Sequence, residues 1–113
     1  MSDDEFRQML AAVSAEYRAG LPARLAGIDE LWGRIMRGMD AVQAMNDLIR
    51  ALHTIAGSAE TFGLTAVGEA AAAAESRLEP YRDVRQRPDA ASRADITLLL
   101  ETLYRAAGVD ASR

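Results

Sequence analysis

Cysteine is absent from the 113-residue chain and histidine occurs once, which excludes several classes of site. Without cysteine the chain forms no disulfide framework, no cysteine-ligated zinc or iron–sulfur site and no cysteine nucleophile. One imidazole also excludes a histidine cluster that binds a metal ion. Carboxylates are present, but their spacing does not form a calcium-binding loop. We therefore expect neither a metal nor a cofactor.

Lysine is also absent, and the formal net charge is −4. This balance argues against a nucleic-acid partner, because such proteins carry a basic face. No apolar run reaches the roughly 18 residues that a membrane span needs, and the acidic start Met1–Glu5 is unlike a secretory signal. We expect a cytoplasmic domain without a membrane partner.

Only three prolines occur, β-branched residues are sparse, and alanine is the commonest residue, so the composition favours helices. Apolar residues recur at spacings of three and four. We expect Gly20 to end a first helix and Pro22 to start a second, with Asp40 capping the third and Asp89 or Ser92 the fifth. The expected helices cover residues 3–19, 21–37, 41–62, 65–79 and 90–107.

Five helices with short connections in one chain predict an all-α fold: an antiparallel up-down four-helix bundle with an additional N-terminal helix. We expect one domain over residues 1–113, with its core at 3–107 and a frayed tail at 109–113. The alanine-rich helix at 65–79 must allow close backbone approach, because its side chains are too small to fill a wide core.

The single imidazole, His53, is predicted on the flank of its helix. At about 100° per residue it lies roughly 120° from the centre of the apolar stripe. Gly57 follows one turn later on the same flank, although a glycine inside a helix costs about 1 kcal/mol relative to alanine. It would leave the imidazole uncovered and let another surface approach. The flank also carries Ile49, Ala56 and Glu60, which we expect to contact a docking partner.

The string His53-Thr54-Ile55-Ala56-Gly57-Ser58-Ala59-Glu60-Thr61-Phe62-Gly63-Leu64 resembles the signature of histidine-containing phosphotransfer (HPt) domains. The segment Leu21-Pro22-Ala23-Arg24-Leu25 after Tyr17 is also similar to the family. The resemblance covers residues 6 to 107. The Thr61-Phe62-Gly63 step is similar to the phosphotransfer domain of chemotaxis kinases.

The resemblance implies that His53 accepts a phosphoryl group from the aspartyl phosphate of a response-regulator receiver domain and returns it to another receiver. Its partners would be receivers and a sensor or hybrid histidine kinase, and the domain would be neither a kinase nor a phosphatase. The family also implies a Glu on the next helix, here Glu75, that hydrogen-bonds the imidazole. An exposed imidazole is largely neutral at neutral pH, and its Nε2 is nucleophilic when Nδ1 carries the proton.

The family usually has a Lys three residues after the His, where this chain has Ala56. Arg50, one turn before His53, is the candidate for a replacement cation. Otherwise Arg50 is a solvated residue of the helix surface.

There are four alternative functions to this one, and the first of them stays open. The same module could be the phosphotransfer domain of a larger kinase, although the start at Met1 and the short tail favour a free-standing protein. A receiver-docking module without transfer is disfavoured by the intact pair of His53 and Gly57. An enzyme is disfavoured because Thr54 and Ser58 point away from His53 and no phosphate-binding loop is present. The acidic balance disfavours a helix-turn-helix regulator.

Overall fold

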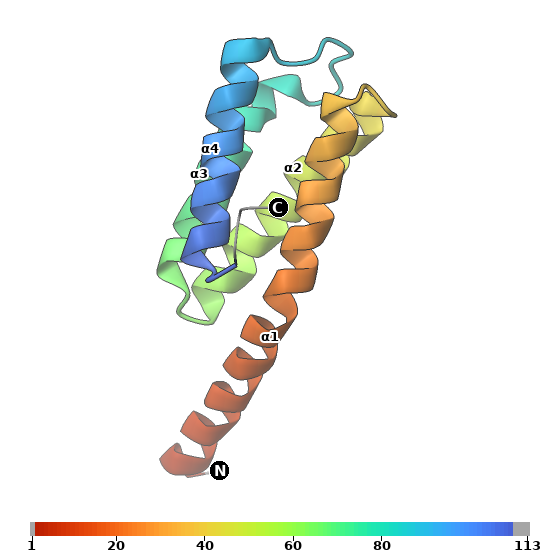
Figure 1. Ribbon diagram of the computed structural model, residues 1–113. Helices are drawn as coiled ribbons and strands as arrows, with labels where there is room; N and C mark the ends of the chain where they lie inside the picture. The colour runs from red at the N-terminus through yellow and green to blue at the C-terminus, as the bar shows by residue number, and fades with distance from the viewer. Residues whose placement is uncertain (1, 110–113) are drawn as a thin grey trace.

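A computed structural model of the chain describes residues 2–109 as an all-helical fold (Figure 1). The helices are α1 (Asp3–Met36), α2 (Ala41–Thr61), α3 (Thr65–Leu78) and α4 (Ala90–Ala106), and a 3-10 turn η1 (Glu79–Tyr81) follows α3. Each helix turns back along the one before it, so the four helices enclose a common core (Figure 1). The all-helical prediction is confirmed.

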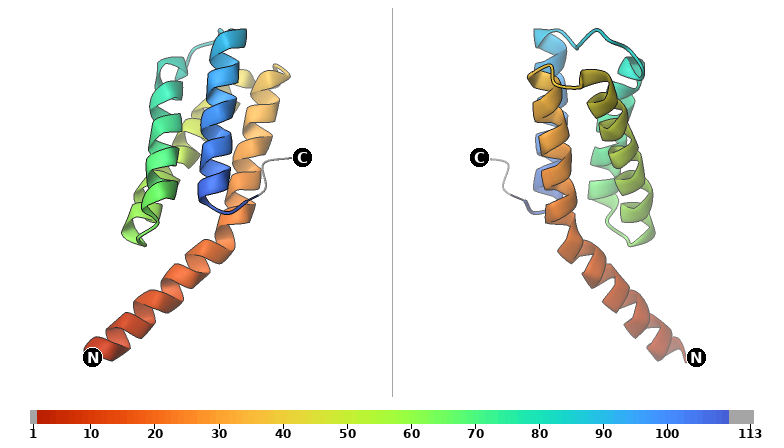
Figure 2. Two further views of the ribbon diagram at one scale, coloured as in Figure 1. Left: turned by 60° about the vertical axis from the view of Figure 1, so that its left-hand side comes forward. Right: turned by 90° about the vertical axis from the view of Figure 1, so that its right-hand side faces the viewer.

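The first helix differs from the sequence-based prediction, because it does not end at Gly20. It is continuous from Asp3 to Met36 and contains Pro22. The separate N-terminal helix that we expected is therefore wrong, and its residues form an extension of α1 that leaves the bundle (Figure 2). Pro22 lies inside this helix and lacks the N–H that would bond the carbonyl four residues earlier. Tyr17 and Leu21, on both sides of Gly20, are buried in the bundle. This packing holds the chain helical through the predicted stop.

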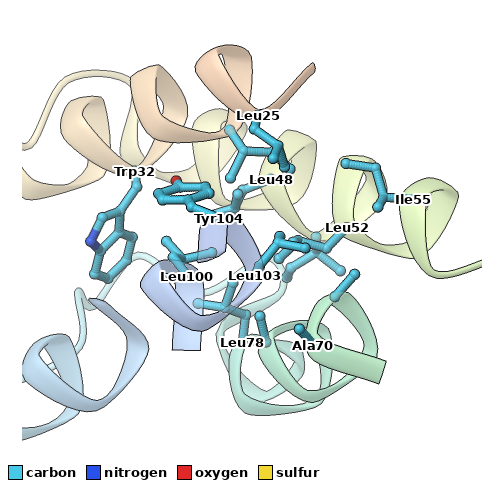
Figure 3. Close-up of a cluster of buried hydrophobic side chains, with 14 of the residues drawn as sticks. Leu25, Trp32, Leu48, Leu52, Ile55, Ala70, Leu78, Leu100, Leu103 and Tyr104 are labelled. Carbon is cyan, nitrogen blue, oxygen red and sulfur yellow. The ribbon is translucent and has the colours of Figure 1, made fainter. Parts of the chain in front are cut away.

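The core is built from apolar side chains of all four helices (Figure 3). The side chain of Trp32 extends from α1 to α4, where its Nε1–H donates to Thr97 Oγ1 at 3.1 Å. Tyr17 of α1 contacts α2, with its hydroxyl 2.7 Å from Ser58 Oγ and its ring 5.0 Å from that of Phe62. Large side chains thus fill the space between α1, α2 and α4.

The contact between α2 and α3 is closer than this, because small residues of α3 face α2. Ala71 and Ala74 are fully buried. At Gly68 an added Cβ would lie 3.3 Å from the carbonyl oxygen of Ala56 and 3.5 Å from the amide nitrogen of Glu60. This confirms the close backbone approach expected for the alanine-rich helix. The two helices that carry the candidate site are therefore held at a fixed, short separation.

The helix starts agree with the predicted capping residues in one case of two. Asp89 caps α4, where its Oδ1 accepts from the Ser92 amide at 2.8 Å. That hydrogen bond is the largest of the effects that lower the pKa of the Asp89 carboxyl. Asp40 precedes α2 but has φ of 46° and makes no capping hydrogen bond, so its predicted capping role is wrong.

The segment between η1 and α4 is hydrogen-bonded to the last residue of α1 and to the N-terminal part of α2. Asn46 of α2 donates to Asp83 Oδ1 at 2.8 Å and accepts from the Asp83 amide at 3.0 Å. Arg87 donates to the carbonyl of Met36 at 3.0 Å. Of the tail expected at 109–113, only Val109 is described, and it packs against the core; the rest lies outside the described residues. Across residues 2–109 no helix combines the length and hydropathy needed to cross a membrane.

One substitution at two glycines tests the close contact. Gly57→Leu adds a side chain where an added Cβ meets nothing within 4 Å. Because Leu is the better helix former by roughly 0.8 kcal/mol, the free energy of unfolding should stay constant or rise. Gly68→Leu forces α3 away from the Ala56 carbonyl and should cost about 1–3 kcal/mol. Urea unfolding followed by circular dichroism measures both, and equal losses would contradict the role given to Gly68.

Candidate phosphotransfer site

His53 lies on the exposed side of α2, in the part of the helix that packs against α3. Leu52 and Ile55, on the apolar stripe of the same helix, are buried and fix the rotation of α2 about its axis. The His53 side chain is 76% exposed. The imidazole is therefore presented to solvent by a helix whose opposite face is anchored in the core.

Glu75 of α3 holds the imidazole from one side. Its Oε2 lies 2.9 Å from His53 Nδ1, and its side chain is only 21% exposed. An ionised carboxylate only accepts hydrogen bonds, so this contact favours the tautomer with the proton on Nδ1. In the neutral ring Nε2 is then unprotonated and has its lone pair available. The family-based expectation for Glu75 agrees with this geometry.

A shallow hollow of about 290 Å³ lies beside the imidazole, between α2 and α3. Gly57 forms part of its wall, where an added Cβ would meet nothing within 4 Å. The placement of Gly57 on the open flank is thus as expected. The hollow is lined by His53, Ala56, Gly57, Glu60, Thr65, Gly68, Glu69, Ala72 and Glu75.

The lining of the hollow is acidic. It includes the carboxylates of Glu60, Glu69 and Glu75, and no arginine is among the described residues that form it. One turn beyond Glu75, Glu79 accepts from Arg82 Nε at 2.7 Å and from its Nη2 at 3.1 Å. This hydrogen bond is the main cause that lowers the pKa of Glu79, and the charges of Arg82 and His53 act in the same direction. Arg82 therefore brings a cation to the α3 side of the site.

Two of the three expected docking residues lie at the hollow, and one does not. Ala56 and Glu60 form part of its lining. Ile49 is fully buried at 0% exposure, so its predicted contact with a partner is wrong. On the helical wheel Ile49 lies roughly 60° from Leu52, as far as Ile55 on the other side. Ile49 lies on the same flank of α2 as Ala56, whose carbonyl oxygen is close to α3. This flank is buried at Ile49.

Arg50 lies outside the hollow. It lines a groove between α1 and α2 with Arg24 and Asp47, and its Nη1 is 3.4 Å from Asp47 Oδ1. The structure thus brings His53, Gly57 and Glu75 together without Arg50. Its role as the substitute for the family's lysine stays a prediction.

Four residues of α3 that line the hollow are not among the predicted site residues: Thr65, Gly68, Glu69 and Ala72. A signal for them exists in the spacing. Counting back from Glu75 in steps of three and four reaches Ala72, Gly68 or Glu69, and Thr65, which share one helix face. A helical wheel of α2 alone does not contain this face of α3.

The family model of the Hpt domain matches residues 4–108. This range covers most of the chain, and the chain belongs to the Hpt family. No curated protein matches the chain, and no solved structure does. Hpt domains carry phosphoryl groups on histidine in two-component phosphorelays and interact there with receiver domains and kinases.

The tautomer of His53 is testable in solution because the chain has 1 histidine. We expect nitrogen-15 imidazole shifts to report mainly Nδ1–H in the wild type, and a clear loss of that tautomer in Glu75→Ala. Glu69→Ala is the matched control, since Glu69 lines the same hollow from the same helix. An unchanged tautomer in Glu75→Ala would contradict the assigned hydrogen bond.

Proposed function

We propose that the chain accepts a phosphoryl group on His53 from the aspartyl phosphate of a receiver domain and passes it to another receiver. The observation that carries this proposal is the hydrogen bond between Glu75 and His53 Nδ1 at 2.9 Å, on a ring that is 76% exposed. The carboxylate holds the proton on Nδ1, and the exposure leaves Nε2 accessible to a large partner. A buried imidazole could also keep its proton on Nδ1, but its Nε2 would not be accessible to a partner.

The transfer is a displacement at phosphorus. The lone pair of Nε2 forms the N–P bond, the P–O bond to the receiver's aspartate breaks, and the aspartate leaves as a carboxylate. No proton has to move, because Nδ1 keeps its proton and Nε2 carries none. The ring gains positive charge as the bond forms, and the Glu75 carboxylate stabilises that charge. Return of the phosphoryl group follows the same path in reverse.

The chain contributes the nucleophile and its orientation, and the partner contributes the remainder. Phosphoryl transfer depends mostly on positioning and on stabilisation of charge. The hollow beside His53 is lined by carboxylates, which do not stabilise a phosphoryl group. Stabilisation of the transferred group therefore falls to the receiver and its divalent metal ion. In this proposal the protein is a phosphocarrier without a kinase active site, and it works in the cytoplasm, where receivers and ATP are found.

The same site also suits a phosphotransfer domain within a larger histidine kinase, since His53 would then accept from ATP bound to the kinase. The Thr61-Phe62-Gly63 step favours this second candidate. Incubation with a phosphorylated receiver, and separately with a chemotaxis-type catalytic domain and ATP, distinguishes the two phosphoryl donors.

The acceptor is tested by His53→Gln, which removes the only imidazole. With a phosphorylated receiver, the wild type should gain acid-labile, base-stable phosphate, and the variant should gain none. Circular dichroism should be unchanged, because the side chain is exposed. Transfer that persists in this variant would refute the assignment of His53.

The docking face is tested by Gly57→Leu, which leaves both His53 and Glu75 in place. Reacting atoms must come within about 3–3.5 Å, and a misplacement of about 1 Å can cost 10²-fold in rate. A leucine one turn from His53 should obstruct the rim of the receiver, so transfer should slow by about 10²-fold and receiver binding should weaken. Normal transfer by this variant would show that the partner does not approach over Gly57.

A further inference from the structure

Residues 3–16 of α1, here called the arm, extend beyond the bundle. The other helices do not accompany this part of α1, and the arm points away from them (Figures 1 and 2). The long axis of the molecule consequently measures 54 Å, against 28 and 19 Å for the other two axes.

The arm carries an apolar stripe that is exposed to solvent. Phe6, Met9, Leu10 and Val13 are 53%, 47%, 47% and 40% exposed. Their spacing of three, four and seven residues places them on one side of the helix. The same line continues into Tyr17, which is buried in the bundle. The stripe is thus the continuation of the core-facing side of α1 beyond the end of its own bundle.

A bare helix of this length is marginal in water, because isolated helices shorter than about 12–15 residues are weakly stable. Four large apolar side chains on one exposed face also mark an interaction surface. The arm therefore needs a partner that offers a complementary apolar stripe.

We propose that the arm pairs with the arm of a second copy of this chain, in antiparallel orientation. The charge distribution favours this occupant. Asp3, Asp4 and Glu5 are at the tip of the arm, and Arg18 lies just beyond its base, two residues after Glu16. In antiparallel order each acidic tip lies near Arg18 of the other copy, and the two helix dipoles are opposed. In parallel order the two acidic tips would lie side by side and repel each other.

One register satisfies both the stripe and the charges. With Leu10 of one arm opposite Val13 of the second copy, Phe6 reaches the base of the other arm beside Tyr17. In this alignment Asp3 faces Gly20 of the second copy. Arg18 is two residues from Gly20, on the same flank of the stripe as Asp3, so an ion pair can form there at both ends of the pair.

The size of the contact predicts a weak dimer. The arm is about 20 Å long and presents one stripe, whereas stable interfaces bury about 800 Å² on each partner. We therefore expect association that depends on concentration, with monomers at low micromolar concentration and dimers at several hundred micromolar.

Sedimentation equilibrium on the full chain tests the stripe with a matched pair of variants. Val13→Glu places a charge on the stripe and should raise the dissociation constant by at least about tenfold. Ala15→Glu adds the same charge two residues away on the opposite side of the helix and should leave the constant unchanged. Thermal unfolding of both variants checks that the bundle is intact. A wild type that stays monomeric at all concentrations, or equal effects of the two variants, would overturn the proposal.

The orientation is tested by reversing the charges. Asp3→Arg alone and Arg18→Asp alone should each weaken the homodimer by about two- to fivefold. An equimolar mixture of the two variants should recover the wild-type constant, because each arginine then faces an aspartate. Tighter association of Asp3→Arg alone would indicate parallel arms and refute the register. His53 lies outside the arm, so failure of this test would not affect the phosphotransfer proposal, and the reverse also holds.

Discussion

The separation of α2 and α3 is the constraint on which the site depends. Gly68 lies so close to α2 that an added Cβ would be 3.3 Å from the Ala56 carbonyl oxygen. A glutamate side chain is short, so Glu75 reaches His53 Nδ1 at 2.9 Å only because the two helices are this near. The alanines around Gly68 therefore help to set the helix separation at which Glu75 can hydrogen-bond the imidazole. They also give α3 strong intrinsic helix propensity, which limits local distortion of the carboxylate.

The charges around His53 divide the work between this chain and its partner. Glu75 stabilises positive charge on the ring, but carboxylates beside a phosphoryl group repel it. A cation in the hollow would offset this repulsion, and it would also form an ion pair with Glu75 that competes for the ring. Ala56, at the position of the family's usual lysine, has no charge and so does not compete with the imidazole for Glu75. Arg82, which follows α3, is hydrogen-bonded to Glu79. In the proposed transfer, the unphosphorylated site would keep the imidazole oriented, and the receiver would stabilise the phosphoryl group.

Sequence patterns predicted the parts of the fold that depend on local chemistry. The glycines at 38, 63 and 108 have positive φ and follow helices, as glycine at helix ends predicts. The exposed His53 and open Gly57 followed from one helical wheel. Two of the errors have a common cause, because packing between helices decided both. Burial of Tyr17 and Leu21 kept α1 helical through Gly20, and Ile49 is buried in the core. Single-helix reasoning contains no information on what packs against a face.

The same reasoning explains why α1 has two parts with different requirements. Within the bundle, the stripe of α1 is covered by α2 and α4, and burial of its large side chains supplies stability. Beyond Tyr17 the stripe continues without a covering helix, although the residues keep the same spacing. A stripe without a partner gives no stability to the monomer and adds to the risk of aggregation. Its persistence outside the bundle is accounted for when a second molecule covers it, and pairing at this end leaves the face that carries His53 open to a receiver.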